Sequence, residues 1–377
     1  GAARSNAARA LGAAEDKDSV ELLVKAATTD ADLRVRVSAV RSLAALKDAK
    51  AADKLIERGN QLLIPIHGDP APLKPGERRI LKPIEVPLPK NELLEIATTV
   101  GRLLANTGNT EAARFLMKLM SEDNFRSAEP MVAFARIGPK NYLNMTVPPG
   151  AYSDFRVASA YGQGLAEFAN LKDEALNAEA GKKLTDFIAG MATGVKPKDE
   201  ARMMLALADL TGSLAALKPD NLDEILRGQL KNDDVFIRAA AAGAIAERPV
   251  SKENVEALKS AFVKASMLDN HDNDALIATL DALEKLDKKA GVGTFLLALN
   301  DHDYLVRKKA FGILDDKDLQ KEFPGIPASL AAARERKRDQ VLPYSPVSAT
   351  KLGQIVNTDA DYRRALSRKN GSVKAVL

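Results

Sequence analysis

The chain has 377 residues, of which 46% are hydrophobic and none is cysteine or tryptophan. Its 55 Lys and Arg against 51 Asp and Glu give a net charge of +4, too small an excess to indicate nucleic acid or an anionic membrane as the main partner. The absence of Cys excludes disulfides, thiolate metal sites and cysteine nucleophiles. It favours a periplasmic or secreted location only slightly, because a cytosolic or thermophilic origin is nearly as compatible with it. No stretch approaches the roughly 18 apolar residues that a membrane span needs.

A recurring phrase opens a helix at three places. It reads TDADLRVRVSAVRSL from Thr29 to Leu43, KNDDVFIRAAAAGAI from Lys231 to Ile245, and LNDHDYLVRKKAFGIL from Leu299 to Leu314. In each copy an Asp stands at the N-cap position, and small and aliphatic residues recur along one helix face. Arg238 and Arg307 are 69 positions apart, or two repeats of roughly 35 residues, a period that indicates a stacked array.

Apolar spacing predicts further helices between the three copies, about fifteen in all. They are expected at residues 18–28, 51–63, 91–105, 111–120, 125–137, 155–169, 175–192, 199–217, 253–267 and 272–286. A period-2 pattern typical of a strand appears only in SVKAVL, at the end of the chain. The sequence therefore predicts an all-α fold.

Two proline-containing insertions interrupt this array. The first, Leu62–Lys90, holds seven prolines and is expected to run extended, as an ordered strap across the helices. The second is Gly138–Asp154, which includes NMTVPPGAY. We expect a solenoid over residues 1–318 and, over residues 319–377, an extension or a linker toward a further domain.

The residues of the phrase resemble the HEAT repeat, a pair of antiparallel helices whose second helix opens with a Val-Arg pair after an acidic turn. The resemblance implies a right-handed α-solenoid of HEAT-like hairpins. In that family an Asp six positions before the Arg bonds to arginines of adjacent repeats and forms a ladder; Asp30 and Asp301 occupy that place, whereas Asn232 departs from it. We therefore expect structural roles for five residues: Asp30, Arg36, Arg238, Asp301 and Arg307.

The first residues of the chain repeat part of the same pattern. Arg4, Ala7 and Leu11 in RSNAARAL have the Arg, Ala, Leu spacing of a second repeat helix. No first helix precedes them, so the chain is expected to begin inside a repeat.

The last residues carry a second resemblance. From Asp361 onward the sequence is similar to the lead-in of a cyclophilin-type peptidyl-prolyl isomerase domain, which bacterial HEAT-repeat proteins sometimes carry at the C-terminus. The resemblance implies that the catalytic Arg and the aromatic pocket of that family would lie after Leu377.

Motifs for catalysis, cofactors and metals are not apparent. His67, His271 and His302 stand alone, and DNHDND (Asp269–Asp274) lacks the Gly and the closing Glu of a calcium loop. YGQG (Tyr161–Gly164) follows no strand, so its glycines are expected to permit close helix packing rather than nucleotide binding. We expect no catalytic residue, no cofactor and no metal in this chain.

The leading interpretation is a non-catalytic scaffold that binds a protein or peptide on a curved helical surface. The candidate contact residues, which the helix pattern points away from the core, are Ser38, Arg41 and Lys309. The alternative is the accessory, client-binding region of a cyclophilin-type isomerase. A nucleic-acid-binding solenoid, based on RERKR (Arg334–Arg338) and RRALSRK (Arg363–Lys369), remains a third interpretation that salt-dependent binding would test.

Overall fold

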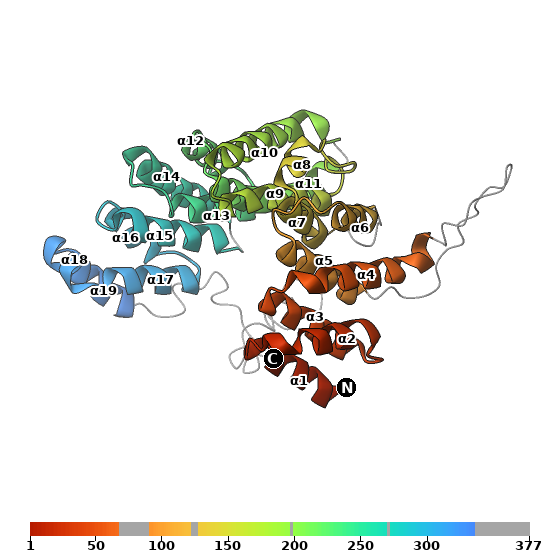
Figure 1. Cartoon of the computed structure of the whole chain (residues 1–377). Coiled ribbons are helices and arrows are strands. Elements are labelled where there is room, and N and C mark those ends of the chain that lie inside the picture. Colours follow the sequence, from red (N-terminus) through yellow and green to blue (C-terminus); the bar gives the residue numbers. More distant parts are fainter. Residues whose placement is uncertain (68–89, 122–126, 197–198, 270–271, 336–377) are drawn as a thin grey trace, which may run out of the picture. The chain divides into compact units, whose positions relative to one another are not determined.

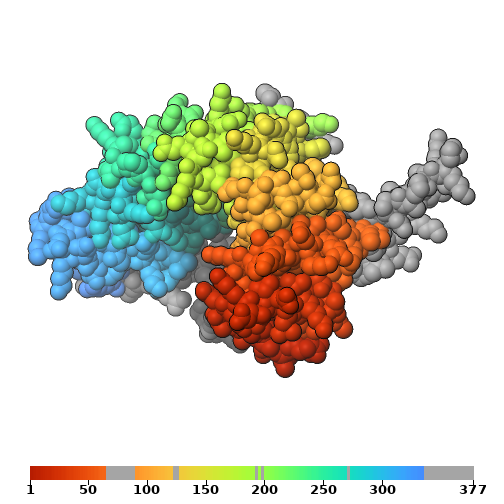
Figure 2. Space-filling model, in the orientation of Figure 1, coloured from red at the N-terminus to blue at the C-terminus, as the bar shows by residue number. Residues whose placement is uncertain are grey.

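A computed structural model describes residues 1–67, 90–121, 127–196, 199–269 and 272–335 (Figure 1). All regular secondary structure in these ranges is helical. The chain divides into two compact units, Gly1–Leu226 and Arg227–Leu377. Within each unit the side chains of neighbouring helices form a continuous surface (Figure 2).

The first unit contains eleven complete α-helices among its described residues. These are α1 (Ala2–Ala13), α2 (Val20–Thr29), α3 (Leu33–Leu46), α4 (Ala52–His67), α5 (Lys90–Leu103), α6 (Thr110–Met120), α7 (Ala128–Ile137), α8 (Pro139–Asn144), α9 (Phe155–Ala166), α10 (Glu174–Gly194) and α11 (Glu200–Leu217). Short 3-10 helices occur at η1 (Lys17–Ser19), η2 (Ala49–Ala51) and η4 (Glu167–Asn170).

Alternate helices of the first unit form one continuous row. In the order α1, α3, α5, α7, α9 and α11, each helix packs against the next. The helices α2, α4 and α6 pack against one another in the same way and cover this row from one side. Because each helical hairpin contacts its neighbours in sequence, the core runs along the array.

The second unit repeats the arrangement. Its helices are α13 (Val235–Ile245), α14 (Lys252–Leu268), α15 (Asp274–Asp287), α16 (Val292–Ala298), α17 (Tyr304–Leu314), α18 (Lys317–Glu322) and α19 (Ile326–Glu335). Here α13, α15, α17 and α19 pack in order, while α14 and α16 pack on α15 and α17. The division between the units falls inside α12 (Leu222–Gln229).

The chain is an all-α solenoid, as its sequence predicts. The described part holds nineteen helices rather than about fifteen. The difference lies partly in α8, α16 and α18, which are six or seven residues long. A helix of fewer than two turns is too short to show the 3.6-residue spacing of apolar residues by which helices are predicted.

The Asp of each recurring phrase caps its helix, which confirms that prediction. The Asp32 carboxylate accepts the backbone N–H of Arg34, at 2.9 Å. Asp234 and Asp303 each accept two N–H groups at the start of α13 and α17, at 2.7 to 3.1 Å. These bonds satisfy donors that have no partner within the helix.

The insertion predicted at 62–90 begins later than expected, because α4 continues through Pro65 to His67. A proline removes one hydrogen bond of a helix, and the burial of Leu55 and Leu63 holds the preceding turns in place. Residues 68–89, where the strap is predicted, lie outside the described residues. The insertion predicted at 138–154 contains the short helix α8, whose Tyr142 is fully buried.

The array also continues past Asp318, where its end is predicted. Helix α19 packs against α17 and buries Ile326 and Leu330. The solenoid therefore reaches Glu335. This continuation is not evident from apolar spacing, because α18 is only six residues long and α19 begins with a proline-containing turn. The strand predicted in SVKAVL lies outside the described residues.

An aromatic cluster fills the first unit around Tyr142. Its ring lies 6.0 Å from that of Tyr161, and its hydroxyl donates to the Tyr161 carbonyl oxygen, at 2.9 Å. A Cβ on Gly164 would collide with the Tyr142 hydroxyl, and one on Gly162 would collide with Leu210. The glycines of YGQG therefore permit close helix packing, as predicted.

Candidate interaction surface

The arginines of the recurring phrase make the same local bond in all three copies. Each guanidinium Nη1 donates to the backbone carbonyl six residues earlier: Arg36 to Asp30 at 2.7 Å, Arg238 to Asn232 at 2.8 Å, and Arg307 to Asp301 at 2.8 Å. Asp30 is the C-cap of α2, so the Arg36 bond joins the end of one helix to the start of the next. The arginine thereby fixes the turn of each hairpin.

Two of these arginines also bind a carboxylate from the following repeat. Arg36 contacts Glu92 of α5 through Nε and Nη2, at 2.9 and 2.8 Å, and Glu92 is completely buried. Arg58 donates to the same carboxylate at 3.0 Å. Arg238 binds both carboxylate oxygens of Asp269, the C-cap of α14. No repeated spacing marks Glu92 or Asp269, so neither residue can be identified as an arginine partner from the sequence pattern.

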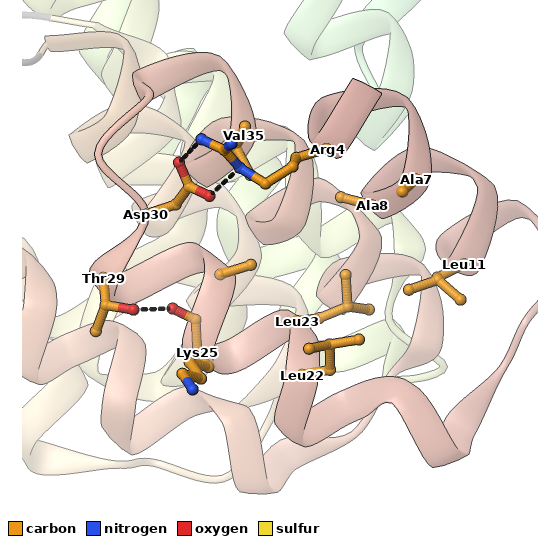
Figure 3. A pocket seen from close by; sticks show the side chains of 11 residues that line it. Arg4, Ala7, Ala8, Leu11, Leu22, Leu23, Lys25, Thr29, Asp30 and Val35 are labelled. Atoms are coloured by element: carbon orange, nitrogen blue, oxygen red, sulfur yellow. Dashed lines mark hydrogen bonds and ion pairs between the residues drawn. The ribbon is translucent and has the colours of Figure 1, made fainter. Parts of the chain in front are cut away.

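Of the two Asp residues expected to bond to arginines of adjacent repeats, Asp30 makes such a bond (Figure 3) and Asp301 does not. The Asp30 carboxylate accepts two bonds from Arg4 of α1, at 2.8 and 3.0 Å. Asp301 accepts the backbone N–H of Asp303, at 2.8 Å, and lies 3.4 Å from His302 Nδ1. Among the residues that the structure describes, no arginine pairs with Asp301. Asn232 makes the same turn bond to the N–H of Asp234, at 2.8 Å, so the amide replaces the local role of the acid.

Ser38 does not face a partner, contrary to expectation. It is buried, and its hydroxyl lies 2.8 Å from the hydroxyl of Ser5, between α3 and α1. Helix α3 belongs to the row of alternate helices and packs against α1 on one side and α5 on the other. A side chain of α3 that points away from α2 can therefore meet α1 instead of solvent. This serine belongs to the helix contact.

Arg41 and Lys309 are reachable from solvent, and both carry ion pairs with the adjacent helix. Arg41 Nε lies 2.7 Å from a carboxylate oxygen of Glu95. Lys309 Nζ lies 2.5 Å from Asp281 and 2.9 Å from Glu284, both on α15. Partial burial opposes the charge of Lys309, but the hydrogen bonds to Asp281 and Glu284 outweigh it and raise the pKa of the ammonium.

The second unit exposes apolar side chains near the ends of its helices, and no sequence pattern predicts this exposure. Phe236 and Leu305 stand two residues after the capping Asp in their repeats, and both are at least half exposed. Tyr304 adjoins Leu305 and is exposed, and so are Met267 and Leu268 at the end of α14. We call this set, Phe236, Met267, Leu268, Tyr304 and Leu305, the apolar turn edge.

Two contacts place the end of α14 beside the turn before α13. Lys264 Nζ lies 2.9 Å from a carboxylate oxygen of Asp233, and Asp269 is held by Arg238. Met267 and Leu268 follow Lys264 by three and four positions, so they share its helix face. The end of α14, which carries Met267 and Leu268, therefore lies beside the turn that precedes Phe236.

The structure also bears on metal binding and on membrane-spanning helices. Within the described ranges, no group of three or more His, Asp or Glu side chains is placed to hold a metal ion. No helix there is long and apolar enough to cross a bilayer. The residues from Asp361 onward, which carry the resemblance to cyclophilin-type isomerases, lie outside the described residues.

The comparisons with known proteins bear on the N-terminal end. A family model described as HEAT repeats matches residues 1–61, which include α1, α2 and α3. No curated protein matches the chain, and nothing found supports the isomerase resemblance. HEAT repeats commonly serve as protein-interaction scaffolds. The match and the all-helical array together support a HEAT-repeat protein.

Proposed function

We propose that this chain is a non-catalytic scaffold that binds another protein along its helical array, with the apolar turn edge as a principal contact. The observation that carries the proposal is the exposure of Phe236 and Leu305 at the same place in two repeats. Neither side chain is needed for the core, which the buried Ile237 and Val306 beside them already form. Exposed apolar clusters of this kind mark protein contacts.

The partner would present apolar side chains rather than a polyanion. Charges near the edge are of both signs, as the pairing of Lys264 with Asp233 illustrates. Arg41 and Lys309 remain proposed polar contacts, because each keeps part of its surface open beside its ion pair. A binding face of this composition predicts weak dependence of affinity on salt, unlike a nucleic-acid contact.

A comparison of retained proteins tests the proposal. Immobilised wild-type protein and a Phe236→Asp, Leu305→Asp variant would be exposed to an extract of the source cells, and retained proteins quantified by mass spectrometry. Val250→Asp is the matched control, since Val250 is an exposed aliphatic residue outside the edge. We expect a partner that wild type and control retain and the double variant loses, with unchanged thermal stability.

Reconstitution with the purified partner completes the test. Calorimetric affinity should change little between low and moderate salt. A partner retained equally by all three proteins, or binding that collapses with salt, would contradict the apolar contact.

A further inference from the structure

The most exposed large apolar side chain in the described part of the chain is a methionine of the apolar turn edge. Met267 is 72% exposed. The sequence holds eight methionines, all within the described ranges, and Met117 of α6, at 50%, is the other exposed one. Met131 and Met203 are buried. The chain therefore has one highly accessible thioether inside its proposed contact surface, and buried thioethers elsewhere for comparison.

Met267 lies near the end of α14, at a point where the backbone of the helix is fixed. Asp269, the C-cap residue two positions later, is held by Arg238. The backbone N–H of Asp269 donates to the carbonyl oxygen of Ala265, at 2.8 Å, and Ala265 is completely buried. Because the Met267 side chain itself contributes little to the core, the last turn of α14 should keep its place when the end of that side chain is modified.

The exposed side chains next to Met267 in the sequence and on its helix face are apolar. Leu268 follows it and is exposed, and Val263, four positions earlier on the same face, is also exposed. The charge of Lys264 is engaged by the carboxylate of Asp233, at 2.9 Å. Oxidation of the thioether would therefore place a polar group among apolar side chains.

Hydrogen peroxide oxidises a thioether to a sulfoxide in one two-electron step. The sulfur lone pair attacks one peroxide oxygen, and the S–O bond forms as the O–O bond breaks. The proton of the transferred hydroxyl passes to the departing hydroxide, which leaves as water. Sulfur is oxidised and the peroxide is reduced, so no further reactant is needed. The product is a polar side chain in place of a flexible apolar one, and dedicated reductases reverse the change.

We propose that Met267 is a site of reversible oxidation by hydrogen peroxide, and that its sulfoxide releases the protein partner from the apolar turn edge. A partner that packs on this edge buries the Met267 side chain. A sulfoxide oxygen buried there loses the hydrogen bonds that it makes with water, so binding weakens while the fold is kept. This inference rests on the proposed scaffold function and adds a form of regulation to the same surface.

Peptide mapping by mass spectrometry tests the oxidation itself and needs no partner. The whole folded protein is treated with hydrogen peroxide, and the conversion of each methionine is followed with time. Met267 should be converted faster than every other methionine, and at least about tenfold faster than the buried Met131 and Met203. Protein oxidised at Met267 alone should keep the Tm of the untreated protein. Conversion of Met267 no faster than that of Met203, or unfolding on its oxidation, would overturn the proposal.

Two leucine variants assign the effect on the protein surface to Met267. Met117→Leu removes the exposed thioether outside the edge, and Met117→Leu, Met267→Leu removes both while it keeps both side chains apolar. Retention of the folded protein on a phenyl matrix is the probe of exposed apolar surface. After peroxide treatment Met117→Leu should elute earlier, whereas the double variant should elute as before. An equal shift in the two proteins, or a shift in neither, would contradict the assignment.

The same two proteins carry the test to the purified partner, with the peroxide removed before the partner is added. Calorimetry should show binding at least about tenfold weaker after oxidation of Met117→Leu, and unchanged binding by the double variant. Equal weakening in both proteins, or none in either, would overturn the release of the partner and leave the proposed function standing. Retention of the partner by the Phe236→Asp, Leu305→Asp variant would overturn the proposed function and this release together.

Discussion

The guanidinium of Arg238 holds both carboxylate oxygens of Asp269, and the two side chains are only 1% and 7% exposed. The same guanidinium donates to the carbonyls of Asn232 and Asp233, both at 2.8 Å. Its Nε is buried without a hydrogen-bond partner. One side chain thus joins the turn before α13 to the end of α14, and the Asp269 carboxylate is the counter-charge of its buried guanidinium.

Removal of one partner of this buried pair should be strongly destabilising. Arg238→Met leaves the Asp269 carboxylate buried without a counter-charge, and we expect a loss of about 3–5 kcal/mol in the free energy of unfolding. Urea denaturation followed by circular dichroism measures it. The double variant Arg238→Met, Asp269→Leu should recover part of the loss, because an apolar pair has no unpaired charge. A double variant no more stable than the single one would contradict this account.

Arg307 provides the comparison for Arg238. It donates to the carbonyls of Asp301 and His302, both at 2.8 Å, and is less buried than Arg238. Arg307→Ala should therefore cost about 1–3 kcal/mol, less than the Arg238 substitution, in the same denaturation experiment. Unchanged stability with loss of partner binding would show that Arg307 is a contact residue instead of a structural one.

Replacement of glycine by alanine should have opposite effects on stability at Gly164 and at Gly212. Gly164→Ala would place a Cβ against the Tyr142 hydroxyl, inside the aromatic cluster, closer than van der Waals contact allows. We expect it to destabilise the fold by about 1–3 kcal/mol through overpacking. A methyl group on Gly212 of α11 would meet no other atom within 4 Å, so Gly212→Ala should stabilise the helix by about 0.5–1 kcal/mol. Equal Tm values for the two variants would contradict the packing assignment.

Acid should weaken the link between α15 and α18. A hydrogen bond from the Lys288 ammonium, at 2.8 Å, and backbone N–H groups lower the pKa of Asp316 to about 2, from an ordinary value of 3.8. A carboxyl with a lowered pKa stabilises the fold above its unfolded-state pKa, and this contribution is lost as pH falls from about 4 through 2. Asp316→Asn should therefore have a slightly lower Tm than the wild type at pH 7, and the two Tm values should be equal at about pH 2.

NMR titration provides the direct check on Asp316. The Asp316 carboxyl should titrate near pH 2 in the wild type. In Lys288→Met it should move toward 3.8, because the largest cause of the shift is removed. An unchanged titration in that variant would show that the backbone N–H groups alone hold the carboxylate.

The purified chain should show no prolyl isomerase activity on a standard proline peptide. This expectation follows from the sequence, in which no nucleophile, metal-binding or cofactor motif is apparent. Turnover that persists through stringent purification, and that follows the protein through gel filtration, would place catalysis in this chain.

The helices and their capping residues could be read from the sequence, because both are local. The repeated Asp, Val-Arg, Ala and Leu spacing places one helix face and one cap, and these depend on residues within a few positions of one another. The capping of α3, α13 and α17 by Asp32, Asp234 and Asp303 is therefore evident from the order of the amino acids alone. A period of about 35 residues likewise predicts stacking.

The partners of the arginines, and the side of the helix that remains exposed, were decided only by tertiary structure. Arg36 meets Glu92 across 56 positions and Arg238 meets Asp269 across 31, and no shared spacing relates the two pairs. Ser38 has the polarity and the helix position of a surface residue, yet α1 covers it. A helix pattern separates one buried face from the rest, whereas a solenoid helix packs against a preceding helix, a following helix and its own hairpin partner. Its exposed face is what these three contacts leave, and they are set by residues far away in the chain.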